Sequence, residues 1–345
     1  MIYNNLEFHN VDHLESVKGM SGVRLHRFPE KIRQKLGTPE NHNGRFRAER
    51  THGCEIRFVT EANYFDIALT AVEADIDIVI YRGDMMHAKH TLKAGICTVI
   101  HAEYPEIYKL SDTAKLPKGR FSPEVWRVQF GMNGYVYFHY LDTFGYEHRP
   151  PFAEEKPSYT WAAYGSSITC GSVTTLYSNS YIEQAAVRLG VDVRNLGLSG
   201  SCLCEKFAAD YLSQLPVDIL STEIGVNMVV PFEEEEYAKR VEYLLKTIRA
   251  ESPARWIFVI DMFPNKGLVL ESPADPYVRH YARYKEIIRE IIKKLEDERM
   301  ILIHGEDVLK DMTYLSTDLL HPSNQGHIFM GENLAAIMRP YIRVP

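Results

Sequence analysis

The chain has 345 residues, of which 25% are charged, and a formal net charge of −7, so it has the composition of an ordinary globular protein. Its length exceeds the usual size of one hydrophobic core, and we therefore expect two domains. Lys and Arg form no dense block, the first residues do not resemble a secretory leader, and no run approaches the roughly 18 apolar residues of a membrane span; these features exclude a nucleic-acid or membrane partner and predict a cytoplasmic protein.

The first half of the chain is predicted to be rich in β-strands. Residues 1 to about 40 are polar and irregular, and we expect them to wrap over this half. Short runs rich in β-branched and aromatic residues follow, separated by turn residues: 54–60, 64–72, 76–81, 89–101, 126–129 and 134–141. Strands at this spacing predict an antiparallel β-sandwich, jelly-roll-like, or a partial barrel.

A charged segment with three prolines, residues 147–157, separates this half from a segment with a different hydrophobic pattern. Exposed, proline-containing stretches of this kind are typical of domain boundaries. We place the domains at 1–155 and 156–345.

The second half alternates apolar runs with amphipathic stretches. The expected strands are 160–164, 191–196, 219–224, 256–262 and 301–304, and the expected helices are 180–189, 205–214, 233–250 and 277–298. This alternation predicts an α/β domain, with a parallel five-stranded sheet flanked by helices. Ligands of such folds collect at the carboxyl ends of the strands.

Four polar motifs fall at or near this edge of the expected sheet. Residues 165–169, Gly-Ser-Ser-Ile-Thr, follow the first strand, residues 195–201 the second and residues 224–228 the third, while residues 316–322 lie near the C-terminus. Each motif alone is equally typical of a turn, a loop or a helix cap. Their joint appearance in this order points to a site.

Acyl transfer requires a nucleophile, a base, and a group that orients the base. Ser167 is the candidate nucleophile because it stands just after the first strand. His321 is the candidate base, and Asp318, three residues before it, can accept from the imidazole Nδ1–H and fix the reactive tautomer. The candidate oxyanion donors are the N–H groups of Ser167 and Gly200 and the side-chain amide of Asn227.

These motifs resemble the four sequence blocks of the SGNH (GDSL-type) hydrolases, over roughly residues 158–340. The resemblance implies that the parallel sheet is flavodoxin-like. By that resemblance Ser167 matches the nucleophile, Gly200 and Asn227 the second and third blocks, and Asp318 with His321 the Asp-x-x-His block. The form of the first block, preceded by a β-rich domain, is similar to a two-domain branch related to carbohydrate esterases.

Two positions depart from the family pattern. Ser166 and Met228 stand where the family usually has aspartates. Neither position has an assigned chemical role in this site, so we expect altered support of the two loops rather than lost catalysis.

The function expected from these residues and this resemblance is that of a serine esterase. Its substrate would be a small acyl ester, most plausibly an acetylated sugar, and its mechanism would need no cofactor. An acyltransferase that uses the same acyl-enzyme, and an inactive sugar-binding protein of the same fold, remain alternatives. The sugar, the acyl length and the oligomeric state stay open, with a homo-oligomer among the options.

The cysteines and histidines predict no metal site. The chain has five cysteines, an odd number spread over a long chain, for which free thiols are the natural expectation. Cys202 and Cys204 are separated by one residue, whereas structural zinc sites use wider pairs and a second pair elsewhere.

Overall fold

The computed structural model describes residues 1–37, 43–112, 115–117 and 119–342. The chain forms two compact units, of which unit 1 comprises Met1–Pro29 and Glu49–Ser158 and unit 2 comprises Glu30–Ala48 and Tyr159–Pro345. The chain passes from unit 1 to unit 2 for the second time after Ser158, and the expected boundary after residue 155 lies three residues before that point.

Part of the N-terminal segment belongs to unit 2. Helix α1 (Glu30–Arg33) contacts α6 (Lys206–Ser213), and the Gly37 N–H donates a 3.0 Å hydrogen bond to the Glu205 carboxylate. The expectation that residues 1 to about 40 all wrap over the first domain is therefore wrong for residues 30–37; residues 38–40 lie outside the described residues.

Unit 1 contains two antiparallel sheets in the described residues, as the sequence predicted. The first has the order β1-β2-β5-β10-β7-β8, with β12 also paired to β5, and the second has the order β3-β4-β11-β6-β9. The strands are β1 (Ile2–Tyr3), β2 (Leu6–His9), β3 (His13–Glu15), β4 (Val23–His26), β5 (Glu55–Thr60), β6 (Tyr64–Val72), β7 (Ile76–Arg82), β8 (Met85–Leu92), β9 (Cys97–Glu103), β10 (Val125–Phe130), β11 (Tyr135–Asp142) and β12 (His148–Arg149). Unit 1 also contains the short helical elements α3 (Glu106–Lys109) and η2 (Ala153–Glu155).

Aromatic side chains from both sheets meet in the core of unit 1. Phe8 of the first sheet lies edge-on to Phe138 of the second at 5.3 Å between ring centroids, and Phe65 contacts both Phe58 and Trp126 at 5.0 and 5.1 Å. Burial of these rings between the sheets is what holds a sandwich together.

One expected strand of unit 1 is wrong. Residues 89–101 do not form a single strand but contain the end of β8 and the start of β9. The chain reverses between them, because Ile96 N–H bonds to Lys93 O and Gly95 takes a φ of +78°, a value that favours glycine.

Unit 2 is built on a parallel five-stranded sheet, which confirms the predicted α/β fold. Its strands are β13 (Thr160–Gly165), β14 (Asp192–Gly197), β15 (Ile219–Glu223), β16 (Trp256–Ile260) and β17 (Met300–Ile303), in the order β14-β13-β15-β16-β17. In order of sequence this is 2-1-3-4-5, the flavodoxin-like arrangement. The strand order reverses at β13, so residues that follow β13 stand at the topological switch point.

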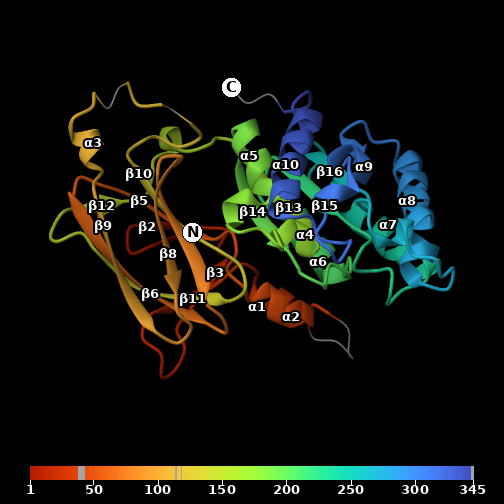
Figure 1. Cartoon of the computed structure of the whole chain (residues 1–345), viewed down its shortest axis with the longest axis horizontal. Coiled ribbons are helices and arrows are strands. Elements are labelled where there is room, and N and C mark those ends of the chain that lie inside the picture. The colour runs from red at the N-terminus through yellow and green to blue at the C-terminus, as the bar shows by residue number, and fades with distance from the viewer. Residues whose placement is uncertain (38–42, 113–114, 118, 343–345) are drawn as a thin grey trace. The chain divides into compact units, whose positions relative to one another are not determined.

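Helices cover both faces of this sheet. Helices α5 (Tyr181–Leu189) and α10 (Asn324–Met338) pack side by side on one face, and α6, α7 (Glu234–Ala250) and α8 (Pro276–Leu295) cover the other (Figure 1). The shorter helical elements are α2 (Asn43–Ala48), α4 (Ser167–Cys170), η3 (Tyr177–Asn179), η4 (Lys266–Leu268), α9 (Gly305–Val308) and η5 (Met312–Tyr314). None of the helices in the described residues is both long enough and apolar enough to span a membrane.

Candidate active site

Ser167 is the first residue of the short helix α4, directly beyond the end of β13. Ser166 forms the N-cap of this helix, and its hydroxyl accepts the Ile168 N–H at 3.1 Å. Gly165, the last residue of β13, allows the tight turn, because a Cβ there would lie 2.1 Å from Thr169 Oγ1. Ser166 thus supports the loop as a cap, in the position where the family usually has an aspartate.

His321 lies within hydrogen-bond distance of Ser167. The Ser167 Oγ to His321 Nε2 distance is 2.7 Å, and the His321 Nδ1 to Asp318 Oδ2 distance is 2.6 Å. With Nδ1–H donating to the carboxylate, Nε2 is the acceptor for the serine hydroxyl. The structure therefore brings Ser167, His321 and Asp318 into one hydrogen-bonded chain.

A tight turn holds Asp318 beneath its histidine. Asp318 Oδ1 accepts hydrogen bonds from the Ser316 hydroxyl, the Leu320 N–H and the His321 N–H at 2.7, 2.9 and 3.0 Å. Partial burial raises the pKa of the Asp318 carboxyl, but the hydrogen bonds from His321, Ser316 and Leu320 outweigh it and hold the pKa well below its usual range. Asp318 is therefore ionised at neutral pH and able to stabilise an imidazolium on His321.

The loop after β14 carries Gly200 and is tied to β13. Leu198 N–H bonds to Gly165 O at 2.8 Å, Ser201 N–H bonds to Leu198 O at 2.9 Å, and Gly200 between them has a φ of +67°. This left-handed conformation explains the glycine. Within the described residues, neither the Ser167 N–H nor the Gly200 N–H donates to another protein atom.

Asn227 is oriented by the same loop. Its side-chain oxygen accepts the Cys202 N–H at 3.1 Å, which leaves the NH₂ group as the part of the amide available to a substrate. The preceding Gly225 has a φ of +123°, and a Cβ there would lie 2.7 Å from Met262 Cγ. Met228, in place of the usual family aspartate, is fully buried in the core.

A second histidine, to which the sequence analysis assigned no role, connects the segments that carry Ser167 and His321. His327 on α10 is fully buried and accepts the Tyr181 N–H at Nδ1, while its Nε2–H donates to Ser172 O at 2.9 Å. Ser172 N–H in turn bonds to Ser167 O. Burial lowers the pKa of His327 to about 4, so it is a neutral link between the serine and histidine segments.

Glu223 is a further residue that the sequence analysis missed. It ends β15, lies fully buried, and accepts the Ser166 N–H at 2.7 Å. The sequence did contain a signal, because Glu223 is the one charged residue near the end of an expected strand that is otherwise uncharged. Burying an unpaired charge costs free energy, so a carboxylate in such a strand indicates specific partners.

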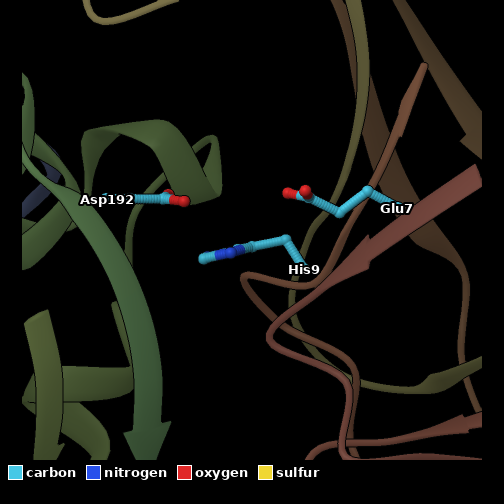
Figure 2. A group of neighbouring side chains, drawn as sticks. All are labelled: Glu7, His9 and Asp192. Atoms are coloured by element: carbon cyan, nitrogen blue, oxygen red, sulfur yellow. The ribbon is translucent and has the colours of Figure 1, made fainter. Parts of the chain in front are cut away.

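Among the described residues, one group of side chains offers potential metal ligands, and its members belong to different units. Figure 2 shows Glu7 and His9 extending from β2 of unit 1, together with Asp192 from β14 of unit 2. Arg57 donates to Glu7 at 3.1 Å, and Lys156 forms an ion pair with it, so its charge is already matched inside unit 1. We assign no metal to this group.

A family model described as "GDSL-like Lipase/Acylhydrolase family" matches residues 160–339, more than half of the chain. No curated protein sequence matches this chain closely enough to count as a relative.

Several solved structures share the fold. The salicylyl-acyltransferase SsfX3 from a tetracycline biosynthetic pathway has a TM-score of 0.76 and 17% identity, covering 99% of this chain and 97% of its own. A family two carbohydrate esterase from Clostridium thermocellum has a TM-score of 0.62 and 14% identity, covering 85% and 93%. An acetyl xylan esterase from Butyrivibrio proteoclasticus has a TM-score of 0.55 and 12% identity, covering 84% and 90%. The shared fold thus extends over the N-terminal β unit.

Proposed function

The chain belongs to the GDSL-like lipase/acylhydrolase family, and from that premise we propose that it is a serine esterase that hydrolyses small acyl esters through an acyl-enzyme. The proposed substrate is an acetylated carbohydrate, which is supported by the carbohydrate esterases among its fold neighbours. The proposed chemistry needs neither a metal nor a cofactor.

In this mechanism Ser167 Oγ attacks the ester carbonyl while His321 Nε2 takes its proton. Asp318 accepts from Nδ1–H and stabilises the imidazolium. His321 then gives the proton to the departing alcohol, which leaves an acyl group on Ser167. A water molecule, deprotonated by the same nitrogen, releases the acid and restores the serine.

The proposed oxyanion donors are the Ser167 N–H, the Gly200 N–H and the Asn227 amide. Support comes from two features already described: both N–H groups are without protein acceptors in the described part of the chain, and the Cys202 N–H orients the Asn227 amide. Donors fixed in advance cost no reorganisation when negative charge develops on the carbonyl oxygen.

The observation that carries the proposal is the hydrogen-bonded chain from Ser167 through His321 to Asp318. The test is hydrolysis of 4-nitrophenyl acetate through octanoate and of acetylated sugars, together with labelling by a fluorophosphonate probe. We expect turnover of the short esters and labelling of Ser167. A folded protein that neither turns over esters nor reacts with the probe would instead support the inactive sugar-binding alternative.

Asn227→Ala tests the third oxyanion donor. We expect kcat to fall by about 10²–10³-fold with little change in KM, because the lost hydrogen bond strengthens only as charge develops in the transition state. Steady-state kinetics on 4-nitrophenyl acetate measures the effect. A rise in KM at constant kcat would show that Asn227 only binds the ground state.

A second candidate function is acyl transfer to an alcohol other than water. The observation that favours it is the likeness to a salicylyl-acyltransferase over 99% of this chain. Because both reactions share the acyl-enzyme, product analysis with and without added sugar acceptors distinguishes them. Acylated acceptor formed at the expense of free acid would favour the transferase.

We likewise propose that the larger part of the second domain begins at residue 156 and is stabilised by residues of the N-terminal segment; a fragment comprising residues 156–345 tests this. This fragment lacks α1 and the Gly37 N–H that donates to the buried Glu205 carboxylate. We expect it to be less stable than one in which residues 30–48 are fused to it, because a buried carboxylate without its donor costs about 1–3 kcal/mol. Urea unfolding of the two fragments measures the difference, and equal stability would support a self-sufficient domain beginning at residue 156.

A further inference from the structure

A buried carboxylate lies directly behind the segment that carries Ser167. Glu223 is 1% exposed, and it follows Thr222, which pairs with Tyr164 of the neighbouring β13. Its side chain reaches across Gly165, where a Cβ would lie 2.8 Å from Glu223 Oε2. The glycine at the end of β13 therefore makes room for this carboxylate as well as for the turn.

Glu223 binds two donors on either side of Ser167. Its Oε2 accepts the Ser166 N–H at 2.7 Å and the Thr169 hydroxyl at 3.1 Å. The Thr169 oxygen in turn lies 2.9 Å from the Tyr181 hydroxyl. These contacts attach α4 to the sheet one residue before and two residues after Ser167.

The same contacts determine which backbone N–H groups of the turn have a protein acceptor. Glu223 takes the N–H of residue 166, and the Ser166 hydroxyl takes the N–H of residue 168. The N–H of Ser167 stands between them and, within the described residues, has no protein acceptor. The Glu223 carboxylate and the Ser166 hydroxyl therefore bind the neighbouring N–H groups, and the Ser167 N–H remains available to a substrate oxygen.

The charge on this carboxylate is not compensated by its titratable neighbours. Burial raises the pKa of Glu223 to about 7, against the lowering effect of hydrogen bonds from Ser166 and Thr169. Tyr181 on α5 and Cys202 in the loop after β14 face it, and burial raises both of their pKa values, so both are neutral near pH 7. On the adjacent strand β16 the residue paired with Glu223 is the apolar Ile260.

We propose that Glu223 is a positioning residue for Ser167, and that its ionised carboxylate holds Ser166 and Thr169 more firmly than the neutral acid does. Hydrogen bonds to a charged acceptor are shorter and roughly twice as strong as neutral ones. Protonation loosens both attachments, and a small misplacement of a nucleophile and its oxyanion donor is costly in rate. This role rests on the proposed esterase function.

Glu223→Gln tests the proposal, because glutamine keeps the size and one carbonyl acceptor but cannot ionise. The matched control is Thr222→Val, which alters the neighbouring buried residue of β15, whose hydroxyl has no partner within the described residues. At about pH 8 we expect Glu223→Gln to lower kcat on 4-nitrophenyl acetate about tenfold with KM little changed. The ratio of wild-type to variant kcat should shrink as the pH falls below 7, while Thr222→Val should follow the wild type throughout.

Thermal unfolding gives a second readout that does not depend on activity. A carboxyl whose pKa is raised on folding contributes stability that is present at low pH and lost as the pH rises through its folded pKa, here about 7. The wild type should lose this stability between about pH 5 and pH 8, and Glu223→Gln should not. We therefore expect the variant to have the higher Tm at pH 8 and a similar Tm at pH 5, whereas a purely structural acceptor would leave the variant less stable at every pH.

The proposal is overturned by a wild-type-like kcat in Glu223→Gln, by a loss of kcat that does not vary with pH, or by a variant that is less stable at every pH. If Glu223→Gln does not fold, Thr169→Val decides the question. This variant lacks the hydroxyl that donates to Glu223, so the Glu223 ionisation near neutral pH should move to higher pH in its profile of kcat against pH. A profile that is not shifted relative to the wild type overturns the role. A wild-type protein without esterase activity overturns both this role and the proposed function. An active wild type with an indifferent Glu223→Gln overturns this role alone.

Discussion

Ser167→Ala should lower kcat for 4-nitrophenyl acetate by about four to six orders of magnitude, with the residual rate supplied by binding and the oxyanion donors. The physical reason is that alanine removes the only atom proposed to form the acyl bond, the oxygen that lies 2.7 Å from His321 Nε2. Active-site titration with the fluorophosphonate probe should fall to zero in parallel. Tm should remain close to that of the wild type, because only one hydroxyl is lost.

Ser166→Ala is the matched control, since the two serines are neighbours in one turn. The Ser166 hydroxyl accepts the Ile168 N–H as the N-cap of this helix, and loss of an N-cap costs about 1 kcal/mol of stability. We expect this variant to keep substantial activity at a somewhat lower Tm. Reversed results for the two variants, or less than about a tenfold loss in Ser167→Ala, would contradict the proposed nucleophile.

Periodicity predicted most of the architecture of unit 2. The five strands and the helices α5, α6, α7 and α8 fall within a few residues of their expected bounds, because each strand is a short apolar run and each of these helices repeats apolar residues at three- and four-residue spacing. Helix α10 was not among the helices expected from periodicity. The order of the strands came from the family resemblance, since periodicity carries no information on which strands are neighbours. The matching family model confirms that resemblance.

Unit 1 was less predictable where its strands are short or polar. Strands β1 to β4 lie in a stretch that was expected to be irregular, because two to four residues are too few to show an alternating pattern. Likewise nothing local in residues 30–37 indicates that they pack on unit 2. Their contacts are with Glu205 and α6, far away in the sequence.

The candidate site was predictable in proportion to how local its contacts are. Asp318 and His321 lie in one turn, so their spacing alone suggested the pair. Ser167 and His321 are 154 residues apart, and only the order of the four motifs suggested that they meet. Glu223 and His327 form hydrogen bonds with backbone atoms of segments far away in the sequence, and residue spacing does not show which segments these are.

Asp318→Asn should lower kcat by about 10⁴-fold with little change in KM, because the variant stabilises the wrong tautomer of His321. Three donors converge on Asp318 Oδ1, namely the Ser316 hydroxyl and the N–H groups of Leu320 and His321. The amide oxygen of an asparagine must therefore occupy that position, and its NH₂ group must face His321 Nδ1. Nδ1 of His321 then becomes a hydrogen-bond acceptor, and the ring proton moves to Nε2. A protonated Nε2 can no longer accept the proton of Ser167.

Asp311→Asn is the control, because Asp311 caps η5 in the same manner, through the Thr313 N–H and hydroxyl at 2.8 Å, without contacting a histidine. It should keep wild-type kcat.

The pH dependence of Asp318 follows from its lowered pKa. Because the pKa of Asp318 is lower in the folded chain than in the unfolded chain, the carboxylate stabilises the fold at pH values above the usual pKa range of an aspartate. This stabilisation is lost only as the pH falls toward the folded-state pKa. Loss of wild-type activity on mild acidification therefore cannot come from Asp318, and Asp318→Asn should lower kcat equally across the neutral range. If Asp318→Asn reduces kcat by less than about tenfold, Asp318 does not set the tautomer of His321 and the proposed mechanism is wrong at this step.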